Sequence, residues 1–188
     1  MSPTRPPPTT RTLYRHVGSK DGLVDLMVDE VYGLFTVTRG GGWRVALRDL
    51  GTSGWRAVGR HPWFARLAFS RPPFGPHALG VHDAALAELE PLGLPAATRM
   101  GFVSTVLGHV LGSGLALLEE RTMRAGTGLS TDADLAAVAA PYLDQIAATG
   151  RFPRFSRWAA EPDRMSPPPQ TFEAILEWLL DGLSALTE

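Results

Sequence analysis

The sequence predicts an all-α protein, and three observations support this fold class. Apolar residues recur every three to four positions in each long segment, no alternating pattern of useful length indicates a β-strand, and proline or glycine runs separate the segments. Hydrophobic residues make up 44% of the 188 residues, which suits one domain with a real core plus a small appendage. The chain has no cysteine, which excludes disulfides and thiolate chemistry and fits a reducing compartment. Residues 1–12 lack the apolar core of a signal peptide, so we expect a cytoplasmic protein.

Three regions are expected along the chain, namely residues 1–11, 12–39 and 43–188, with Gly40-Gly41-Gly42 between the last two. We expect the first region to be a disordered or extended tail, because its four prolines resist helix formation. The second contains a helix from Lys20 to about Phe35 with one apolar stripe. Residues 1–20 hold four basic residues and no acid, so the net charge of −1 leaves −5 on the rest. This asymmetry is typical of a DNA-reading tip on a regulatory core, although an ordinary basic tail explains it equally well.

Six further helices are expected in the third region, over residues 43–59, 63–69, 77–92, 95–124, 131–149 and 170–186. His61-Pro62 separates the first two, and Pro95 suits the first turn of the longest helix. Thr131 and Asp134 resemble a capping box at the start of the next helix. Residues 151–169 are rich in proline, arginine and aromatic residues, so we expect a long loop there that acts as a lid or is merely anchored by its rings.

The longest helix contains 18 residues without a formal charge, from Gly101 to Leu118. That length is at the lower limit for a membrane span, and Gly108 and Gly112 form a GxxxG pair. The run also contains serine, threonine and histidine, and no polybasic flank orients it, so we favour a helix buried at an oligomer interface and expect no membrane partner. The last helix has an apolar stripe wider than one intramolecular neighbour usually needs. The residues expected at this interface are Gly108, Gly112, Ala116, Phe172, Ile175, Leu176, Leu179 and Leu183.

A short aromatic and basic segment at the start of the second region indicates nucleic-acid binding. Tyr14, Arg15 and His16 precede a turn, Gly18-Ser19-Lys20, that opens the first helix, with Ser19 placed to cap it. Exposed N–H groups at such a helix start, together with a lysine, suit a phosphate. The string TLYRHVGSKDGLVDLMVDEVYG resembles the end of the DNA-binding domain of TetR-type transcriptional repressors, covering the recognition helix, the turn and the start of the connecting helix.

This resemblance implies that operator DNA is a partner of the chain if its head is complete. The residues that match the DNA-contacting end are Thr12, Tyr14, Arg15, His16 and Lys20. In the family two helices precede this segment, whereas here only residues 1–11 precede it, so the head is expected to be an incomplete remnant. Because an isolated short helix is marginally stable, we expect weak operator binding by the chain as written.

The order of helices in the third region also resembles the TetR ligand-binding and dimerisation domain. The resemblance implies a homodimer, in which the long helix and the last helix pair with their counterparts in a four-helix bundle. It also implies an effector cavity, which we expect to take a small apolar molecule and to be lined by Trp63, Phe64, Leu67, Phe69, Phe102, Thr105 and His109. A simpler interpretation makes the aromatic residues core and His109 a satisfied core histidine. Thr36 and Leu50 stand where tetracycline-responsive members have polar residues, so tetracycline with its magnesium is not the expected effector.

No motif indicates catalysis, a cofactor or a metal. The chain lacks a nucleophile elbow, a phosphate-binding loop and a zinc-protease motif, and His77 and His82 are five positions apart, which does not align them on a helix. The sequence therefore predicts an effector-responsive TetR-type repressor that is not an enzyme. Two alternatives remain open, namely a ligand-binding and dimerisation module without DNA activity and a small membrane-associated helical protein built on residues 101–118.

Overall fold

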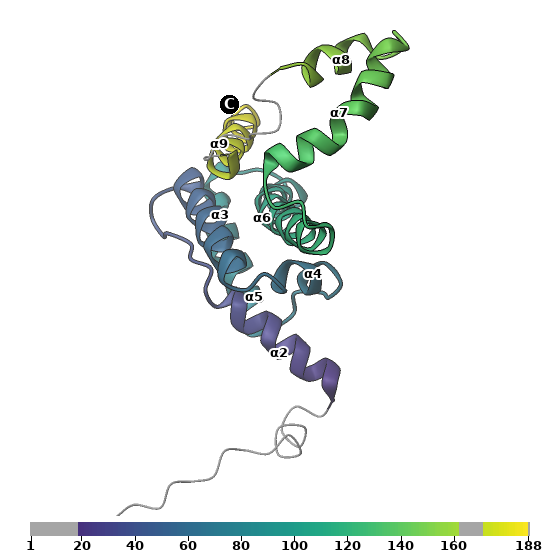
Figure 1. Cartoon of the computed structure of the whole chain (residues 1–188). Coiled ribbons are helices and arrows are strands. Elements are labelled where there is room, and N and C mark those ends of the chain that lie inside the picture. The colour runs from purple at the N-terminus through teal and green to yellow at the C-terminus, as the bar shows by residue number, and fades with distance from the viewer. Residues whose placement is uncertain (1–18, 162–170, 188) are drawn as a thin grey trace, which may run out of the picture. The chain divides into compact units, whose positions relative to one another are not determined.

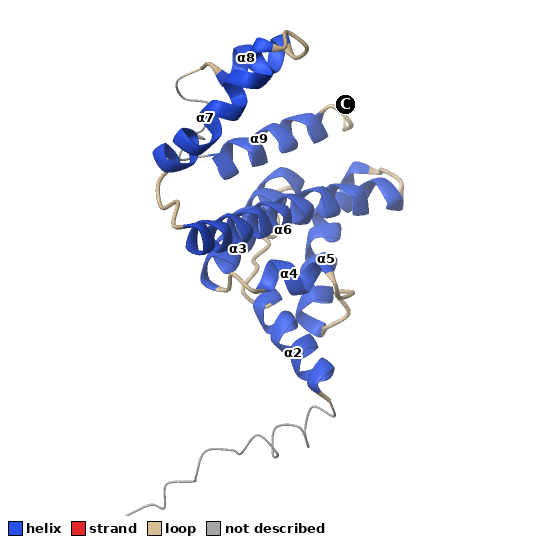
Figure 2. Ribbon diagram, turned by 45° about the vertical axis from the view of Figure 1, so that its right-hand side comes forward, coloured by secondary structure: helices blue, strands red, loops and turns tan. Residues whose placement is uncertain are grey.

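A computed structural model describes residues 19–161 and 171–187 of the chain. Every regular element in these residues is a helix, which confirms the all-α prediction (Figure 2). The elements are α2 (Lys20–Tyr32), α3 (Trp43–Arg60), α4 (Phe64–Phe69), α5 (Pro76–Leu89), the short 3-10 helix η1 (Glu90–Leu92), α6 (Ala96–Thr127), α7 (Asp132–Ala148), α8 (Pro153–Ala159) and α9 (Thr171–Ser184). The expected loop over residues 151–169 is wrong in part, because Pro153 at the first turn starts the short helix α8.

The described residues form two compact units (Figure 1). The first unit holds residues 19–115 and 176–187, and the second holds residues 116–161 and 171–175. Helices α6 and α9 each contribute residues to both units. Helix α2 belongs to the first unit, where it contacts α4 and α5. The three regions drawn from the sequence stay a prediction.

The core of the first unit is built on α3 and the first half of α6. Helix α3 buries a stripe that includes Leu47, Leu50 and Val58, and α6 buries Val106 and Val110. The two helices approach closely at Gly114, where an added Cβ would lie 2.3 Å from Cγ1 of Val58. A side chain larger than hydrogen at this position would therefore push the helices apart.

An aromatic cluster attaches the C-terminal half of α2 to this core. The rings of Tyr32 and Phe35 lie 5.2 and 5.8 Å from the ring of Phe64 in α4, and Tyr32 lies 5.2 Å from Phe35. All three side chains are buried. Such pairs contribute about 0.5–1.5 kcal/mol each beyond their buried area, so the cluster fixes the exit of α2 against α4.

An ion-pair cluster holds α9 against α3. The guanidinium of Arg48 donates to both carboxylate oxygens of Glu177 at 2.5 and 2.9 Å, and Arg44 donates to Glu177 at 2.9 Å and to Asp181 at 2.5 Å. Arg48 and Arg44 lower the pKa of Glu177 to about 2 by hydrogen bonding to its charged form. Under this cluster Leu176 packs on α3, where its Cδ2 lies 2.8 Å from the position of a Cβ added to Gly51.

The second unit is more open. Thr131 and Asp134 form the expected capping box at the start of α7, which confirms that prediction. Helix α7 contacts α8, and Phe155 and Trp158 of α8 have ring centroids 5.3 Å apart. Arg124 near the end of α6 binds Glu120 and Asp132. Among the described residues of α7 and α8 none is buried, so this unit depends on local contacts.

Helix α6 is the only helix in the described part of the chain that is long and apolar enough to cross a membrane. A core helix of a soluble protein passes the same test, so this feature is weak evidence for a membrane span. The apolar residues Phe102, Val103, Val106 and Val110 on one side of α6 are almost fully buried within the chain. Because 33% of the apolar segment of α6 is buried, the core accounts for one face of this helix.

Candidate functional site

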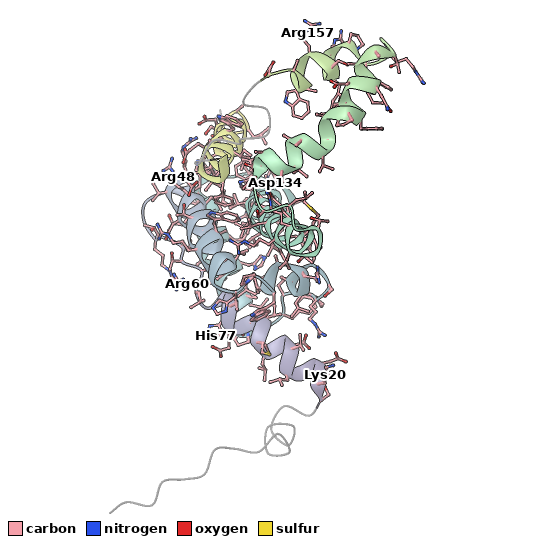
Figure 3. The ribbon with its side chains drawn as sticks, viewed as in Figure 1. Lys20, Arg48, Arg60, His77, Asp134 and Arg157 are labelled. Atoms are coloured by element: carbon pink, nitrogen blue, oxygen red, sulfur yellow. The ribbon has the colours of Figure 1, made fainter. Side chains whose placement is uncertain are left out.

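Helix α2 carries the first candidate site, because its first residue, Lys20, is a predicted DNA contact. Ser19 caps the helix by accepting a hydrogen bond from the Gly22 N–H at 3.0 Å, as the sequence predicts. Lys20 is exposed and lies at the N-terminal end of α2 (Figure 3). The other predicted DNA contacts, Thr12, Tyr14, Arg15 and His16, lie outside the described residues.

One arginine attaches the N-terminal half of α2 to the rest of the first unit, which follows α2 in the chain and is called the body. Arg71, in the segment after α4, donates from Nη1 to Oδ1 of Asp25 at 2.5 Å and from Nη2 to Oδ1 of Asp21 at 3.0 Å. The two carboxylates are four positions apart and so lie one above the other on one face of the helix. These two bonds raise the pKa of Arg71 further above its ordinary value. The guanidinium thus clamps two successive turns of α2.

The C-terminal half of α2 is attached by a buried carboxylate. Asp29 accepts hydrogen bonds from the backbone N–H groups of Ala78 at 2.9 Å and His77 at 3.2 Å, both in the first turn of α5. Helix α5 has glycine at its N-cap, Gly75, and so lacks a local capping side chain. Asp29 therefore caps α5 from another helix, a place where the helix dipole favours an anion. An added Cβ on Gly75 would lie 2.1 Å from Cγ of Asp29, so only glycine allows this approach.

The glycine run predicted as a boundary is also fixed to the body. The carboxylate of Glu88 in α5 accepts the N–H of Gly40 at 2.7 Å and the N–H of Gly42 at 3.1 Å. Asp49 in α3 accepts the hydroxyls of Thr36 and Thr38 at 2.8 and 2.9 Å. The linker between α2 and α3 is thus bound by two acids, one in α3 and one in α5.

The residues expected around an effector divide between α4 and α6. Phe64 is fully buried in the cluster with Tyr32, and Phe102 is buried with its ring 5.5 Å from that of Trp43. Both side chains therefore have a core role, which agrees with the simpler interpretation. Of the remaining candidates, Trp63, Leu67 and His109 are half-buried, and Phe69 and Thr105 are exposed. A contact of any of these seven residues with an effector stays a prediction.

His109 has a polar neighbour one turn along α6. Its Nδ1 lies 3.3 Å from the hydroxyl of Ser113, and the hydroxyl of Thr105 donates to the Gly101 carbonyl instead. Among the described residues no group of three or more histidines and acids is placed to hold a metal ion.

The expected dimer residues fall into two classes. Gly108, Gly112 and Ala116 are exposed on α6, and an added Cβ on either glycine would meet nothing within 4 Å. Ile175, Leu179 and Leu183 are half-buried. Leu176 and Phe172 are 1% and 6% exposed within a single chain, and the place of all eight residues at an interface stays a prediction.

Three important residues are missed by the sequence reasoning. Arg71 and Asp29 bind partners 46 to 50 positions away, which no local pattern reveals. Trp178 stands 68% exposed on α9, between two leucines of the predicted stripe. At about 100° per residue Asp29 falls on nearly the opposite side of α2 from Met27, which belongs to the predicted apolar stripe and is 42% exposed. The local pattern therefore gave no signal of a buried role for Asp29.

Comparison with known proteins identifies the family of this chain. Residues 38–187 match the tetracyclin repressor-like, C-terminal domain family. The chain is 32% identical over 180 residues to the HTH-type transcriptional repressor DrrR1 of Streptomyces coeruleorubidus, covering 94% of this chain and 66% of that protein. It is 35% identical over 104 residues to an HTH-type transcriptional regulator of Saccharopolyspora erythraea, covering 54% and 44%. The chain thus spans just under two thirds of the first relative and under half of the second.

Solved structures agree with this assignment. Apo ActR of Streptomyces coelicolor matches with a TM-score of 0.73 and 25% identity, over 94% of this chain and 81% of ActR. ActR in complex with actinorhodin matches with a TM-score of 0.74 and 26% identity, over 95% and 82%. The two relatives are both named as transcriptional regulators. The chain belongs to the TetR family, through its tetracyclin repressor-like C-terminal domain.

Proposed function

We propose that this chain is a cytoplasmic, effector-responsive transcriptional repressor of the TetR type. Its body binds a small molecule and dimerises, and α2 passes the state of the body to a DNA-binding head. The observation that carries the proposal is the attachment of α2 to the body at two points, Arg71 on Asp21 and Asp25 and Asp29 on the first turn of α5. A shift of α5 or of the segment before it must therefore move α2.

The mechanism is a change in the population of two conformations. A dimeric repressor binds two half-sites about one helical turn of DNA apart, so the spacing of its two heads decides its affinity. An effector that binds one conformation of the body better shifts the equilibrium toward it, by no more than its difference in affinity for the two. Because α2 begins at the exposed Lys20 on the predicted DNA side, a change in the direction of the helix changes that spacing.

The dimer surface is proposed on α6 and α9. The exposed Gly108 and Gly112 leave a flat strip on α6 against which a second helix packs closely. Trp178 on α9 is a large exposed side chain of the kind that dominates the energy of interfaces. Gly112→Leu is expected to convert a dimer to a monomer in sedimentation, whereas Gly59→Leu, at an exposed glycine of α3 with equal space around it, is the matched control.

The effector class follows from a relative. A solved structure shows ActR in complex with actinorhodin, so polycyclic aromatic molecules are the first class to test on this chain. A ligand that binds only the folded state at 100 times its Kd stabilises it by about 2.7 kcal/mol, which for a chain of this size raises Tm by roughly 5–11 °C. Such a shift with actinorhodin supports the proposal, and a flat response across a panel of polycyclic aromatic molecules contradicts it.

DNA binding is the part that separates the proposal from a module without DNA activity. We expect operator DNA to be retained with a contribution from Lys20, which is placed to contact a phosphate at the start of α2. Filter binding at physiological salt against the DNA flanking its own gene is the measurement. Retention of DNA that falls steeply with salt and is reduced by Lys20→Gln supports the proposal that the N-terminal end of α2 faces DNA. A chain that dimerises but retains no DNA at any salt concentration favours the alternative, a ligand-binding and dimerisation module without DNA activity.

A further inference from the structure

A cavity of about 350 Å³ lies where α2 meets residues 71–75 and the first turn of α5, a region called the joint. The cavity is open to solvent on one side. The residues that line it are Gly22, Asp25, Leu26, Val28, Asp29, Tyr32, Arg71, Pro72, Pro73, Phe74, Gly75, Pro76 and Ala78. None of the seven residues expected around the effector is among them. Its volume is at the lower end of the range for ligand pockets, which is about 300–1,000 Å³.

The walls of the cavity are suited to a flat ring. Tyr32 and Phe74 contribute aromatic surface, and three prolines contribute rigid aliphatic surface. Phe74 is 75% exposed and Leu26 is 51% exposed, so apolar side chains at this site face water. A ring bound between them removes this apolar surface from water, which is favourable in proportion to the area covered.

The polar lining is acidic in balance. The charged groups in the lining are two carboxylates, Asp25 and Asp29, and one guanidinium, that of Arg71. Both Nη atoms of Arg71 already bind carboxylates, and both oxygens of Asp29 accept N–H groups of α5. Asp25 uses only Oδ1, so within the described residues its Oδ2 is a carboxylate oxygen without a hydrogen-bond partner. The lining thus offers a free anionic acceptor beside an aromatic wall.

We propose that this cavity binds a small aromatic ammonium ion, with its ring between Phe74 and Leu26 and its ammonium group on Asp25. The charge balance favours a cation, and an ammonium group near an aromatic face gains further attraction from the ring. An aromatic carboxylate of the same shape meets two acids, and both Nη atoms of the guanidinium in the lining already bind carboxylates, while its Nε is buried without a hydrogen-bond partner among the described residues. This site is separate from the proposed effector cavity of the body.

Binding here has a consequence for α2. An ammonium group on Oδ2 shares the Asp25 carboxylate with Arg71, which binds Oδ1, and weakens the attraction between them, so an occupied cavity loosens the clamp on the N-terminal half of the helix. This consequence rests on the proposed function, but binding itself does not, because it is measured without DNA.

The test compares two probes of matched shape, 2-phenylethylammonium and 3-phenylpropionate, titrated into ¹⁵N-labelled full-length chain. We expect shifts of the backbone amides of residues 25, 74 and 78, and an ammonium probe that binds at least about fivefold more tightly than the carboxylate, a difference typical of one partly exposed charge contact. Equal binding of the two probes, or shifts confined to other residues, overturns the proposal.

Variants locate the contact. Asp25→Asn is expected to weaken the ammonium probe by about fivefold and to strengthen the carboxylate probe, because it removes one acid and frees part of Arg71. Phe74→Ala is expected to weaken both probes alike. Asp83→Asn, at an exposed acid of α5 outside the cavity, is the matched control and should change neither. Asp25 and Phe74 are exposed, so both variants should keep the circular dichroism of the parent, and an unchanged preference in Asp25→Asn overturns the proposal.

Discussion

Replacing Asp29 by alanine should cost the chain about 3 kcal/mol of unfolding free energy. The carboxylate is 7% exposed and binds two N–H groups of α5, at 2.9 and 3.2 Å. Loss of a capping side chain costs about 0.5–2 kcal/mol, and leaving a buried donor unsatisfied costs about 1–3 kcal/mol more. For a chain of this size, 3 kcal/mol corresponds to a fall in Tm of roughly 6–12 °C.

Urea denaturation followed by circular dichroism, at one protein concentration, measures this change. Asp83→Ala removes an exposed acid from α5 and should stay within about 0.5 kcal/mol of the parent. Gly75→Ala should also be destabilising, because its Cβ would lie 2.1 Å from Cγ of Asp29. Since Asp29→Ala removes the two nearest atoms of that clash, the double variant should lose less than the sum of the single losses. A loss below 0.5 kcal/mol for Asp29→Ala, or strict additivity, would refute the cap from α2.

Two further predictions concern α6 and α9. Gly114→Ala should destabilise the chain by about 1–3 kcal/mol because of its contact with Val58, whereas Gly59→Ala, in open space on α3, should be neutral or stabilising by up to about 1 kcal/mol, as urea denaturation will show. The ion pairs of Glu177 hold its pKa at about 2, against an ordinary 4.5. They therefore stabilise the folded chain fully above pH 4.5, and this stabilisation is lost as the pH falls toward 2. Because its side chain is 40% exposed, Glu177→Gln should cost only about 1 kcal/mol at pH 7 and nothing near pH 2, and a cost independent of pH would contradict this assignment.

The helices could be predicted from the sequence because their signals are local. The apolar stripe of α3, the capping side chain of Ser19 and the capping box of Thr131 and Asp134 each depend on residues within four positions. The short helix α8 escaped prediction because its seven residues are too few to show a period, and the proline at its start is equally typical of a loop.

The joint could not be predicted, because its partners are far apart in the chain. Asp29 and the first turn of α5 are 48 and 49 positions apart, and Arg71 reaches back 46 and 50 positions. The wide stripe of α9 was interpreted as a dimer surface, but part of it serves the core of its own chain. Leu176 and Leu180 are almost fully buried within the first unit, to which they belong, whereas Trp178 on the same helix is exposed. A stripe shows which side chains avoid water and does not show which partner covers them.

The two anchors of α2 differ in kind, and this difference predicts how the helix moves. The clamp of Arg71 involves Asp21 and Asp25, which are 83% and 59% exposed, whereas Asp29 is buried and supported by the aromatic cluster of Tyr32. Salt screens exposed pairs far more than buried ones, since the Debye length falls from about 30 Å at 0.01 M to about 3 Å at 1 M. Raising the salt should therefore speed hydrogen exchange of the amides of residues 24–26 and leave those of residues 30–32 unchanged. Equally faster hydrogen exchange in both halves would show that α2 is released as a whole. Unchanged exchange in both halves would show that the clamp of Arg71 does not stabilise the N-terminal half of α2. The expected pattern makes Asp29 the pivot, so the end of α2 that carries Lys20 is the end that swings.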